Sequence, residues 1–328
     1  MIKVLYIGGF RLEKYIIGVD LGGTKITTAI SDLDGHILTK TTIATLSSEG
    51  EKKVVERIIE TIQFVLEESK ISKVKVVSIG IGSPGIINPL EGKIMMAANL
   101  PFENYCLVEP ISAYFNIPCY LENDANAAAL GEFTFGAGRG KKNFIYVTVS
   151  TGVGGAAIID GKLYHGNTSN AFEVGHMILD PRSEIKCNCG LYGDVEALCS
   201  GTAIAKRAVI AIKQGKETLL SGVQEISTKE VYEAYIKKDQ VATEILYEAF
   251  DYMGIAVANL ITIFDPEMVV IGGGVSSIGD LFFDRVKASA KKSCLDFIFD
   301  PVEIMPSSLG QDTGVFGALA IAKNSINN

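Results

Sequence analysis

One pattern occurs twice in this chain, at an offset of about 130 residues, and it limits the folds that the chain can adopt. In residues 15–35 and again in residues 144–161, a buried-type strand runs into a glycine turn, a second strand follows, and an Asp-Gly pair closes a hairpin. Such a repeat indicates internal duplication. A chain of 328 residues is also long for one hydrophobic core. We therefore expect two related domains.

The glycine turns of the two copies are candidate phosphate-binding sites. Glycines after a strand let backbone N–H groups approach an anion, and a threonine hydroxyl adds a donor. Asp20, at the end of the first strand, could hold Mg²⁺ directly or through water. Either turn alone could be a plain hairpin, but the pair predicts a polyphosphate held from both sides. The candidate residues are Gly22, Gly23, Thr24 and Lys25 in the first turn and Thr151, Gly152, Gly154 and Gly155 in the second.

Two further strands end in glycine-rich turns. The apolar run 74–81 is followed by Gly-Ser-Pro-Gly at 82–85, which is either a ligand contact or a simple loop. The apolar run 268–271 is followed by three glycines. Close backbone approach at Gly273 and Gly274 would suit an adenine ring or its ribose.

The stretch 121–132 places polar side chains where a strand meets a helix. The apolar residues before it are typical of a buried strand, and Asp124 opens an alanine-rich segment of high helix propensity. Asn123 and Asp124 are therefore predicted to lie at the junction, where the positive end of the helix helps to keep a carboxylate ionised. A general base needs such a position. The alternative is that Asp124 only caps the helix, as aspartate often does.

A second polar cluster has the residue types and spacing of a tetrahedral zinc site. Such a site would be structural, because the protein supplies all four ligands. It would fix a loop so that Glu173 and Glu196 project toward the ligand, and carboxylates accept hydrogen bonds from sugar hydroxyls. The alternative is two reduced thiols in a loop. The candidate zinc ligands are His176, Cys187, Cys189 and Asp194.

Composition argues against several classes of protein. The chain has 30 Lys and Arg against 38 Asp and Glu, a net charge of −8, so nucleic acid is not an expected partner. No apolar run is long enough to span a bilayer, and the first residues do not resemble a signal peptide. We therefore expect a cytoplasmic protein. Its six cysteines have no regular spacing, which favours thiols or a metal site over disulfides.

Taken together, these motifs resemble those of the ROK family (repressors, open reading frames, sugar kinases). The resemblance implies an α/β fold of the actin-like ATPase (ribonuclease H-like) type, with two lobes around a cleft. The expected lobes are residues 1–122 with 312–328 and residues 123–311. The motifs that carry the resemblance lie at 20–25, 122–132, 151–155, 173–176 and 187–196.

The resemblance also implies a role for each motif. Asp124 would be the general base that takes the proton from the 6-hydroxyl of a sugar, and ATP with Mg²⁺ would occupy the two glycine turns. The positions that line the sugar pocket in this family fall on Gly85, Asn99, Asn123, Glu173, His176 and Glu196.

The metal motif departs from the family's pattern. The family has a third cysteine at the position of Asp194. A carboxylate can ligate zinc, but a site with two thiolates should be weaker and more acid-sensitive than one with three. Family repressors also carry an N-terminal winged helix-turn-helix, for which the residues before Tyr15 are too few.

The sequence therefore predicts an ATP-dependent kinase that phosphorylates a hexose at its 6-hydroxyl, with glucose as the expected substrate. N-acetylmannosamine or N-acetylglucosamine kinases and fructokinases are alternatives, because a small change in one pocket residue can alter sugar choice. Alternatives from other classes are a sugar-sensing protein of the same fold and a structural actin-like ATPase. We expect a homodimer or higher homo-oligomer, and no membrane partner.

Overall fold

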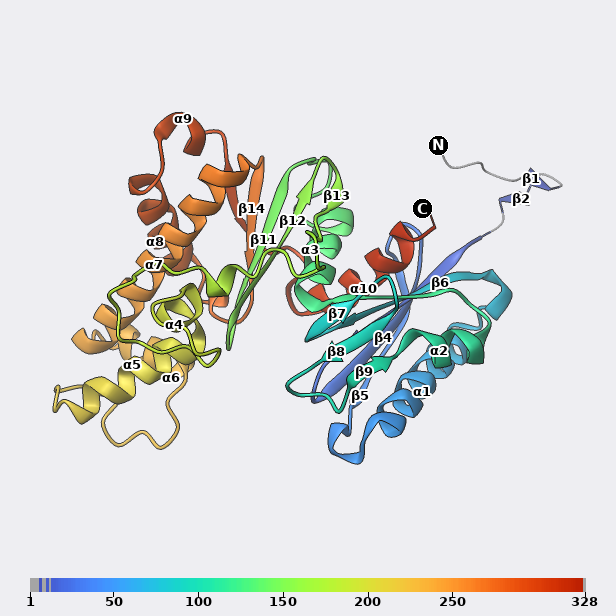
Figure 1. Ribbon diagram of the computed structural model, residues 1–328, viewed down its shortest axis with the longest axis horizontal. Coiled ribbons are helices and arrows are strands. Elements are labelled where there is room, and N and C mark those ends of the chain that lie inside the picture. Colours follow the sequence, from blue (N-terminus) through green and yellow to red (C-terminus); the bar gives the residue numbers. More distant parts are fainter. Residues whose placement is uncertain (1–5, 8–9, 12, 327–328) are drawn as a thin grey trace. The chain divides into compact units, whose positions relative to one another are not determined.

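The computed structural model describes residues 6–7, 10–11 and 13–326, and it divides into two compact units. Unit 1 comprises the described residues up to Gly140, the segment Leu163–Ala171 and the described residues from Ser308 onward. Unit 2 comprises Lys141–Lys162 and Phe172–Ser307. Figure 1 follows the chain through both units.

Unit 1 is built on a five-stranded sheet in the order β10-β6-β3-β4-β5. Strand β3 pairs in parallel with β6 and antiparallel with β4, and β6 pairs in parallel with β10. The strands are β3 (Tyr15–Leu21), β4 (Lys25–Asp32), β5 (Ile37–Ala44), β6 (Val76–Ser83) and β10 (Cys119–Asn123). The helices of this unit are α1 (Glu51–Ser69), α2 (Val108–Phe115), α3 (Asp124–Phe135) and α10 (Thr313–Asn324). A small antiparallel sheet adds β7 (Ile86–Asn88), β8 (Lys93–Met96) and β9 (Glu103–Cys106).

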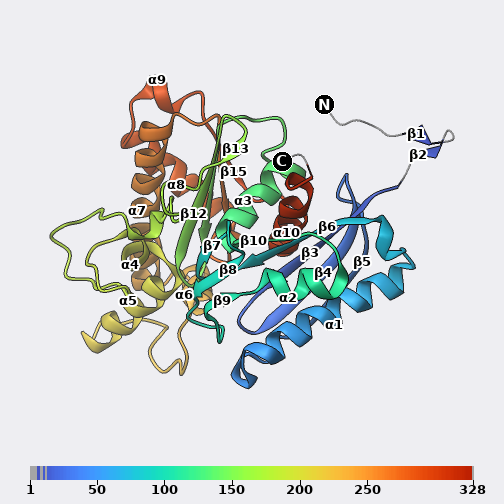
Figure 2. The ribbon, with the colours of Figure 1, turned by 45° about the vertical axis from the view of Figure 1, so that its right-hand side comes forward.

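The alternation of side chains along β3 explains how helices cover both faces of this sheet. Ile17 and Val19 belong to the core that includes α1, whereas Ile16 packs with residues of α10. Gly18 faces the same side of the sheet as Ile16. A Cβ on Gly18 would lie 2.6 Å from the backbone nitrogen of Leu319, so the glycine lets α10 lie directly on the sheet. Figure 2 shows α1 and α2 on one face and α10 on the other.

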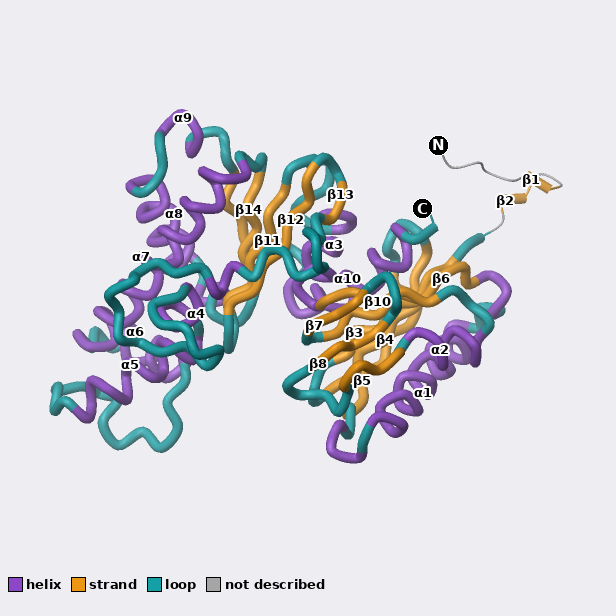
Figure 3. The backbone as a smooth tube through the Cα atoms, in the orientation of Figure 1, coloured by secondary structure: helices purple, strands orange, loops and turns teal. Residues whose placement is uncertain are grey.

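Unit 2 is built on a second five-stranded sheet, in the order β13-β12-β11-β14-β15. Its helices gather on one face, where α7 packs against α4, α5, α6 and α8 (Figure 3). The strands are β11 (Phe144–Val149), β12 (Val153–Ile159), β13 (Lys162–Leu163), β14 (Met268–Gly272) and β15 (Glu303–Pro306). The helices are α4 (Val195–Cys199), α5 (Gly201–Lys213), α6 (Thr228–Ile236), α7 (Gln240–Phe264), α8 (Asp280–Lys292) and α9 (Asp296–Phe299).

The two sheets share one topology, which confirms the predicted duplication. In unit 1, β3 pairs antiparallel with β4 and in parallel with β6, and β10 lies beyond β6. In unit 2, β11 pairs antiparallel with β12 and in parallel with β14, and β15 lies beyond β14. Two α/β units related in this way have the architecture of the actin-like ATPase fold.

The unit boundary lies farther along the chain than the sequence analysis placed it. Residues 123–140 were expected in the second lobe, but they belong to unit 1. The reason is that α3 packs closely on α10, where a Cβ on Gly131 would lie 2.7 Å from the backbone nitrogen of Gly317. The C-terminal part of unit 1 correspondingly begins at Ser308 rather than at residue 312.

A buried carboxylate near the end of α3 holds together two segments of unit 1 that are far apart in the sequence. Glu132 accepts hydrogen bonds from the backbone N–H of Ala137, the hydroxyl of Ser308 and the backbone N–H of Leu309. These bonds satisfy a carboxylate that is fully buried. Ala137, Ser308 and Leu309 all belong to unit 1, so the bonds hold the end of its first segment and the start of its last segment to the same helix.

Strands β1 (Tyr6–Ile7) and β2 (Phe10–Arg11) pair only with each other among the described strands, in a two-stranded antiparallel sheet. Across the described parts of the chain, none of the helices has the length and apolarity required to cross a membrane.

Candidate active site and metal-binding cluster

The junction between β10 and α3 is shaped by Asn123, which caps the helix. Its side-chain oxygen accepts hydrogen bonds from the backbone N–H groups of Ala125 at 2.8 Å and Asn126 at 3.3 Å. Its amide nitrogen donates to the carbonyl of Gly85 at 3.1 Å. The structure therefore gives the capping role to Asn123, whereas the sequence left open whether Asp124 had it.

Asp124 is the first residue of α3 and is exposed. Its Oδ1 accepts a hydrogen bond from the backbone N–H of Ala125 at 2.8 Å. Because Asp124 lies at the positive end of the helix, its carboxylate is stabilised in the ionised form. An exposed, ionised carboxylate at a fixed helix end can accept a proton from a bound hydroxyl.

The structure places two other predicted sugar-binding residues of unit 1 near this junction and near the first glycine turn. Gly85 accepts the bond from Asn123, and its φ of +106° together with the nearby carbonyl of Met96 leaves no room for a side chain. Asn99 is exposed and lies against the turn, because a Cβ on Gly23 would be 2.7 Å from its Cβ.

The first glycine turn presents polar groups beside a largely buried acid. The turn is closed by a hydrogen bond of 2.9 Å from the backbone N–H of Gly22 to the carbonyl of Lys25, and the side chains of Thr24 and Lys25 are exposed. Burial raises the pKa of Asp20, an effect that Lys25 partly offsets. The carboxylate lies against α10, where a Cβ on Gly314 would be 2.5 Å from its Oδ2. A nearby cation would favour the ionised form of Asp20.

The second glycine turn is shorter than predicted. Thr151 and Gly152 lie in the turn, but β12 begins at Val153, so Gly154 and Gly155 are strand residues paired with Thr148 and Val147 of β11. The sequence did not reveal this boundary, because a glycine-rich run gives no period-2 signal. Their proposed contact with phosphate stays a prediction.

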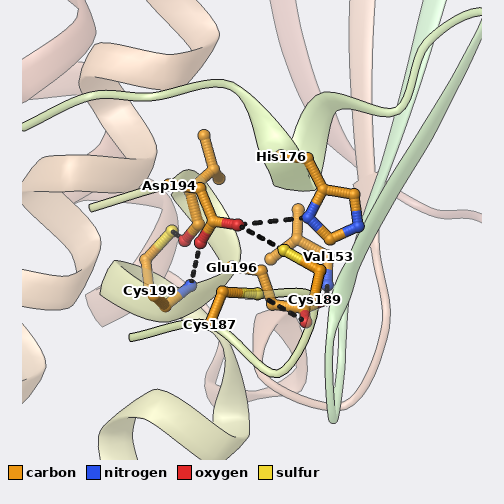
Figure 4. A network of polar contacts seen from close by, with 9 residues as sticks. Val153, His176, Cys187, Cys189, Asp194, Glu196 and Cys199 are labelled. Atoms are coloured by element: carbon orange, nitrogen blue, oxygen red, sulfur yellow. Dashed lines mark hydrogen bonds and ion pairs between the residues drawn. The ribbon is translucent and has the colours of Figure 1, made fainter. Parts of the chain in front are cut away.

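Glu196, at the start of α4, connects this turn to the predicted metal loop. Its Oε2 accepts a hydrogen bond from the backbone N–H of Val153 at 3.1 Å, and its Oε1 accepts one from the thiol of Cys187 at 3.4 Å (Figure 4). A Cβ on Gly152 would overlap the Glu196 carboxylate. The turn, Glu196 and the cysteine loop therefore form one connected structure within unit 2.

We expect Gly152→Ala to lower kcat/KM for the sugar by about ten- to a hundredfold, since the new Cβ displaces Glu196 and small misplacements of binding groups are costly. Steady-state kinetics would measure this. Gly161→Ala is a matched control at the other end of β12: its φ of +76° predicts a loss of stability, but a Cβ there meets no atom within 4 Å. Equal kcat/KM in Gly152→Ala and the wild type would contradict the role of Glu196.

The four predicted metal ligands come together in unit 2. One donor atom from each of them lies within 4.8 Å of the others. The Nδ1 of His176 is 3.1 Å from the Oδ2 of Asp194, which also accepts from the thiol of Cys189 at 3.5 Å (Figure 4). Donor atoms at these separations can converge on one tetrahedral ion with only small adjustments.

Asp194 has a second role, as the cap of α4. It is fully buried, and its Oδ1 accepts a hydrogen bond from the backbone N–H of Ala197 at 2.8 Å, which caps α4. Burial alone would raise the pKa of Asp194, but the hydrogen bonds from Ala197, His176 and Cys189 outweigh it and lower the pKa. One carboxylate thus caps the helix with one oxygen and faces the other donors with the second.

The remaining sugar-binding candidates of unit 2 lie around the beginning of β12. Glu173 is exposed and precedes the 3₁₀ helix Val174–His176. This short helix packs directly on β12, because a Cβ on Gly175 would overlap the carbonyl of Val153. Glu173, His176 and Glu196 are therefore all held next to the beginning of β12.

A cavity of about 460 Å³ in unit 2 includes residues that the sequence analysis did not identify. The beginnings of α5 and α6 both border this cavity. Helix N-termini favour anions and polar groups, so this signal was available in part. The lining residues are Ser150, Thr151, Gly201, Thr202, Ala205, Ile226, Ser227, Thr228, Gly274 and Val275.

The two glycines predicted to approach a nucleotide differ in their surroundings. Gly274 lines the cavity. Gly273 has a φ of +91°, and a Cβ there would overlap the carbonyl of Val149, so its close approach is to β11 of the same unit.

Comparisons with known proteins agree with these features. The sequence profile of the ROK family matches residues 16–325. A glucokinase of Halalkalibacterium halodurans is 34% identical, with 96% of this chain and 97% of the relative covered. The crystal structure of a ROK hexokinase from Thermus thermophilus superposes with a TM-score of 0.84 at 30% identity, covering 95% of this chain and 99% of the other. That of a ROK glucokinase from Streptomyces griseus, in complex with glucose and AMPPNP, has a TM-score of 0.77 at 32% identity, covering 94% and 99%. This chain therefore belongs to the ROK family.

Proposed function

We propose that this chain transfers the γ-phosphoryl group of ATP to the 6-hydroxyl of a hexose, with glucose as its substrate. The observation that carries the proposal is the position of Asp124, exposed at the first residue of α3 while Asn123 caps the helix. The family membership and the relatives that are glucokinases support the same reaction.

Asp124 accepts the proton of the 6-hydroxyl while the oxygen of that hydroxyl attacks the γ-phosphorus and ADP leaves. The helix N-terminus keeps the carboxylate ionised before the reaction, which suits a general base. The other residues bind and orient hydroxyl groups of the sugar. In unit 1 these are Gly85, Asn99 and Asn123, and the family resemblance predicts the same role for Glu173, His176 and Glu196 of unit 2.

The nucleoside of ATP is proposed to bind in the cavity of unit 2, and each glycine turn stays a predicted phosphate contact within its own unit. The beginnings of α5 and α6, together with Gly274, would hold the nucleoside, since this cavity combines polar side chains with apolar ones such as Val275. Mg²⁺, when bound, neutralises charge on the transferring phosphoryl group, and Asp20 would help to hold it. Burial raises the pKa of Asp20, and a bound cation would oppose this shift by favouring the ionised carboxylate.

Zn²⁺ is proposed to bind His176, Cys187, Cys189 and Asp194. Burial raises the pKa of the Cys187 thiol, and a bound zinc ion would favour the thiolate instead. The ion would hold the loop rather than take part in the reaction, since four protein donors fill a tetrahedral shell. Its effect on the sugar would pass through Glu196, which contacts Cys187.

Coupled ADP release with ATP and Mg²⁺ would test the proposal against glucose, mannose, fructose, N-acetylglucosamine and N-acetylmannosamine. We expect strong turnover on glucose. Preference for an N-acetylated sugar or fructose would support the kinase activity but replace glucose as the assigned substrate. Sugar binding by calorimetry without turnover would indicate a sugar-sensing protein, and the absence of both would reject the proposed pocket. The predicted homo-oligomer can be tested on the same preparation by light scattering.

A further inference from the structure

A buried glutamate lies directly before the Asn123–Asp124 junction. Glu122 is only 6% exposed and is the second-to-last residue of β10. Its Oε1 accepts hydrogen bonds from the backbone N–H of Asn123 at 3.0 Å and from the side-chain amide of Asn126 at 2.9 Å. One carboxylate oxygen therefore holds residues on both sides of Asp124.

The other oxygen of Glu122 is held by a histidine from a distant part of the chain. The Nε2 of His165 lies 2.7 Å from the Oε2 of Glu122. This hydrogen bond raises the pKa of His165, although burial partly opposes the shift, and it favours the protonated ring as donor. A carboxylate this deeply buried requires a partner on each oxygen, because an unpaired buried charge is unfavourable.

The segment that carries His165 belongs to unit 1 although the chain on both sides of it belongs to unit 2. Residues Leu163–Ala171 form this excursion. It is closed by a hydrogen bond of 3.2 Å from the backbone N–H of Ala171 to the carbonyl of His165. The contact with Glu122 thus fixes the loop where it reaches β10.

We infer that Glu122 and His165 form a positioning pair, which sets the geometry of the turn from which the Asp124 carboxylate projects. The inference rests on the proposed function of Asp124 as the base. His165 orients Glu122, and Glu122 in turn fixes the backbone of Asn123 and the side chain of Asn126. Neither residue is proposed to touch the sugar or ATP. A base that is displaced by a fraction of an ångström transfers a proton less efficiently, so the pair acts on kcat.

Kinetics of two His165 variants would test this inference. His165→Phe removes the donor and should lower kcat at least about tenfold, with a much smaller change in KM for ATP. His165→Gln keeps an N–H donor at a similar reach and should recover most of the wild-type kcat. Melting temperatures and glucose affinity by calorimetry would show that both variants remain folded and bind sugar.

His36→Phe is the matched control. His36 also bonds to a carboxylate, with Nδ1 2.8 Å from the Oδ2 of Asp32, but this pair is exposed at the hairpin between β4 and β5. The control should keep the wild-type kcat. A normal kcat in a folded His165→Phe variant, or no recovery in His165→Gln, would overturn the inference while leaving the proposed function intact. A wild-type protein that phosphorylates no sugar would instead reject the proposed function, and the role of the pair with it.

Discussion

Replacing Asp124 by Asn is expected to reduce kcat by about 10²- to 10⁴-fold, the usual contribution of a general base, while glucose still binds. The substitution preserves the shape of the side chain and its ability to accept the hydrogen bond from Ala125, but an amide cannot take up the proton of the sugar hydroxyl. The cap of α3 stays in place, because Asn123 provides it. Steady-state kinetics and calorimetric titration with glucose would measure the two effects separately.

Asp280→Asn is a matched control for this experiment. Asp280 is also an exposed aspartate at the first position of a helix, since α8 begins there after Gly279. Each substitution removes a favourable interaction with a helix N-terminus of about 0.3–1 kcal/mol, so both variants should lose a similar, small amount of stability. Only Asp124→Asn should lose turnover. If Asp124→Asn kept its kcat, another group would have to be the base.

The double variant Cys187→Ser/Cys189→Ser is expected to lose its bound zinc and to melt several degrees below the wild type. The wild-type protein should contain about one zinc ion per chain, because the four donor atoms of the cluster already lie within 4.8 Å of one another. Binding to the folded state alone stabilises a protein by about 2.7 kcal/mol when the free metal is at a hundred times its Kd, and this contribution disappears with the site. Elemental analysis and thermal unfolding with and without a chelator would measure both effects.

The same double variant should also raise KM for glucose, since Cys187 contacts Glu196. Cys106→Ser/Cys294→Ser is the control, because both thiols are half-buried and lie outside the cluster. It should retain its zinc. A wild-type protein that contains no zinc after expression in zinc-supplemented medium, and whose melting temperature does not respond to a chelator, would contradict the metal assignment.

Features encoded by short stretches of sequence could be predicted before the structure was known. The duplicated strand and hairpin pattern was visible because alternating apolar residues and Asp-Gly turns are local signals. The metal cluster was visible for a similar reason. Cys187, Cys189 and Asp194 lie within one short loop, and His176 precedes it by few residues, so their spacing alone brings compatible donors close together.

Details of the junction depended on partners from elsewhere in the chain. Both Asn123 and Asp124 are good capping residues, so sequence alone could not decide between them. The choice was made by Gly85, whose carbonyl holds the Asn123 amide and so aims its oxygen at the start of α3. Likewise, the pairing of β12 with β11 placed Gly154 and Gly155 in a strand, although their composition suggested a turn.

The sequence by itself thus determined the duplicated α/β plan, the carboxylate at a helix start and the metal donors, since each follows from neighbouring residues. Tertiary structure decided the rest. The cavity of unit 2 is assembled from four separate segments near residues 150, 201, 227 and 274. Glu122 and His165 are 43 residues apart in the sequence and meet only through the fold. Contacts of this kind depend on how the chain packs, and no local pattern of residues records them.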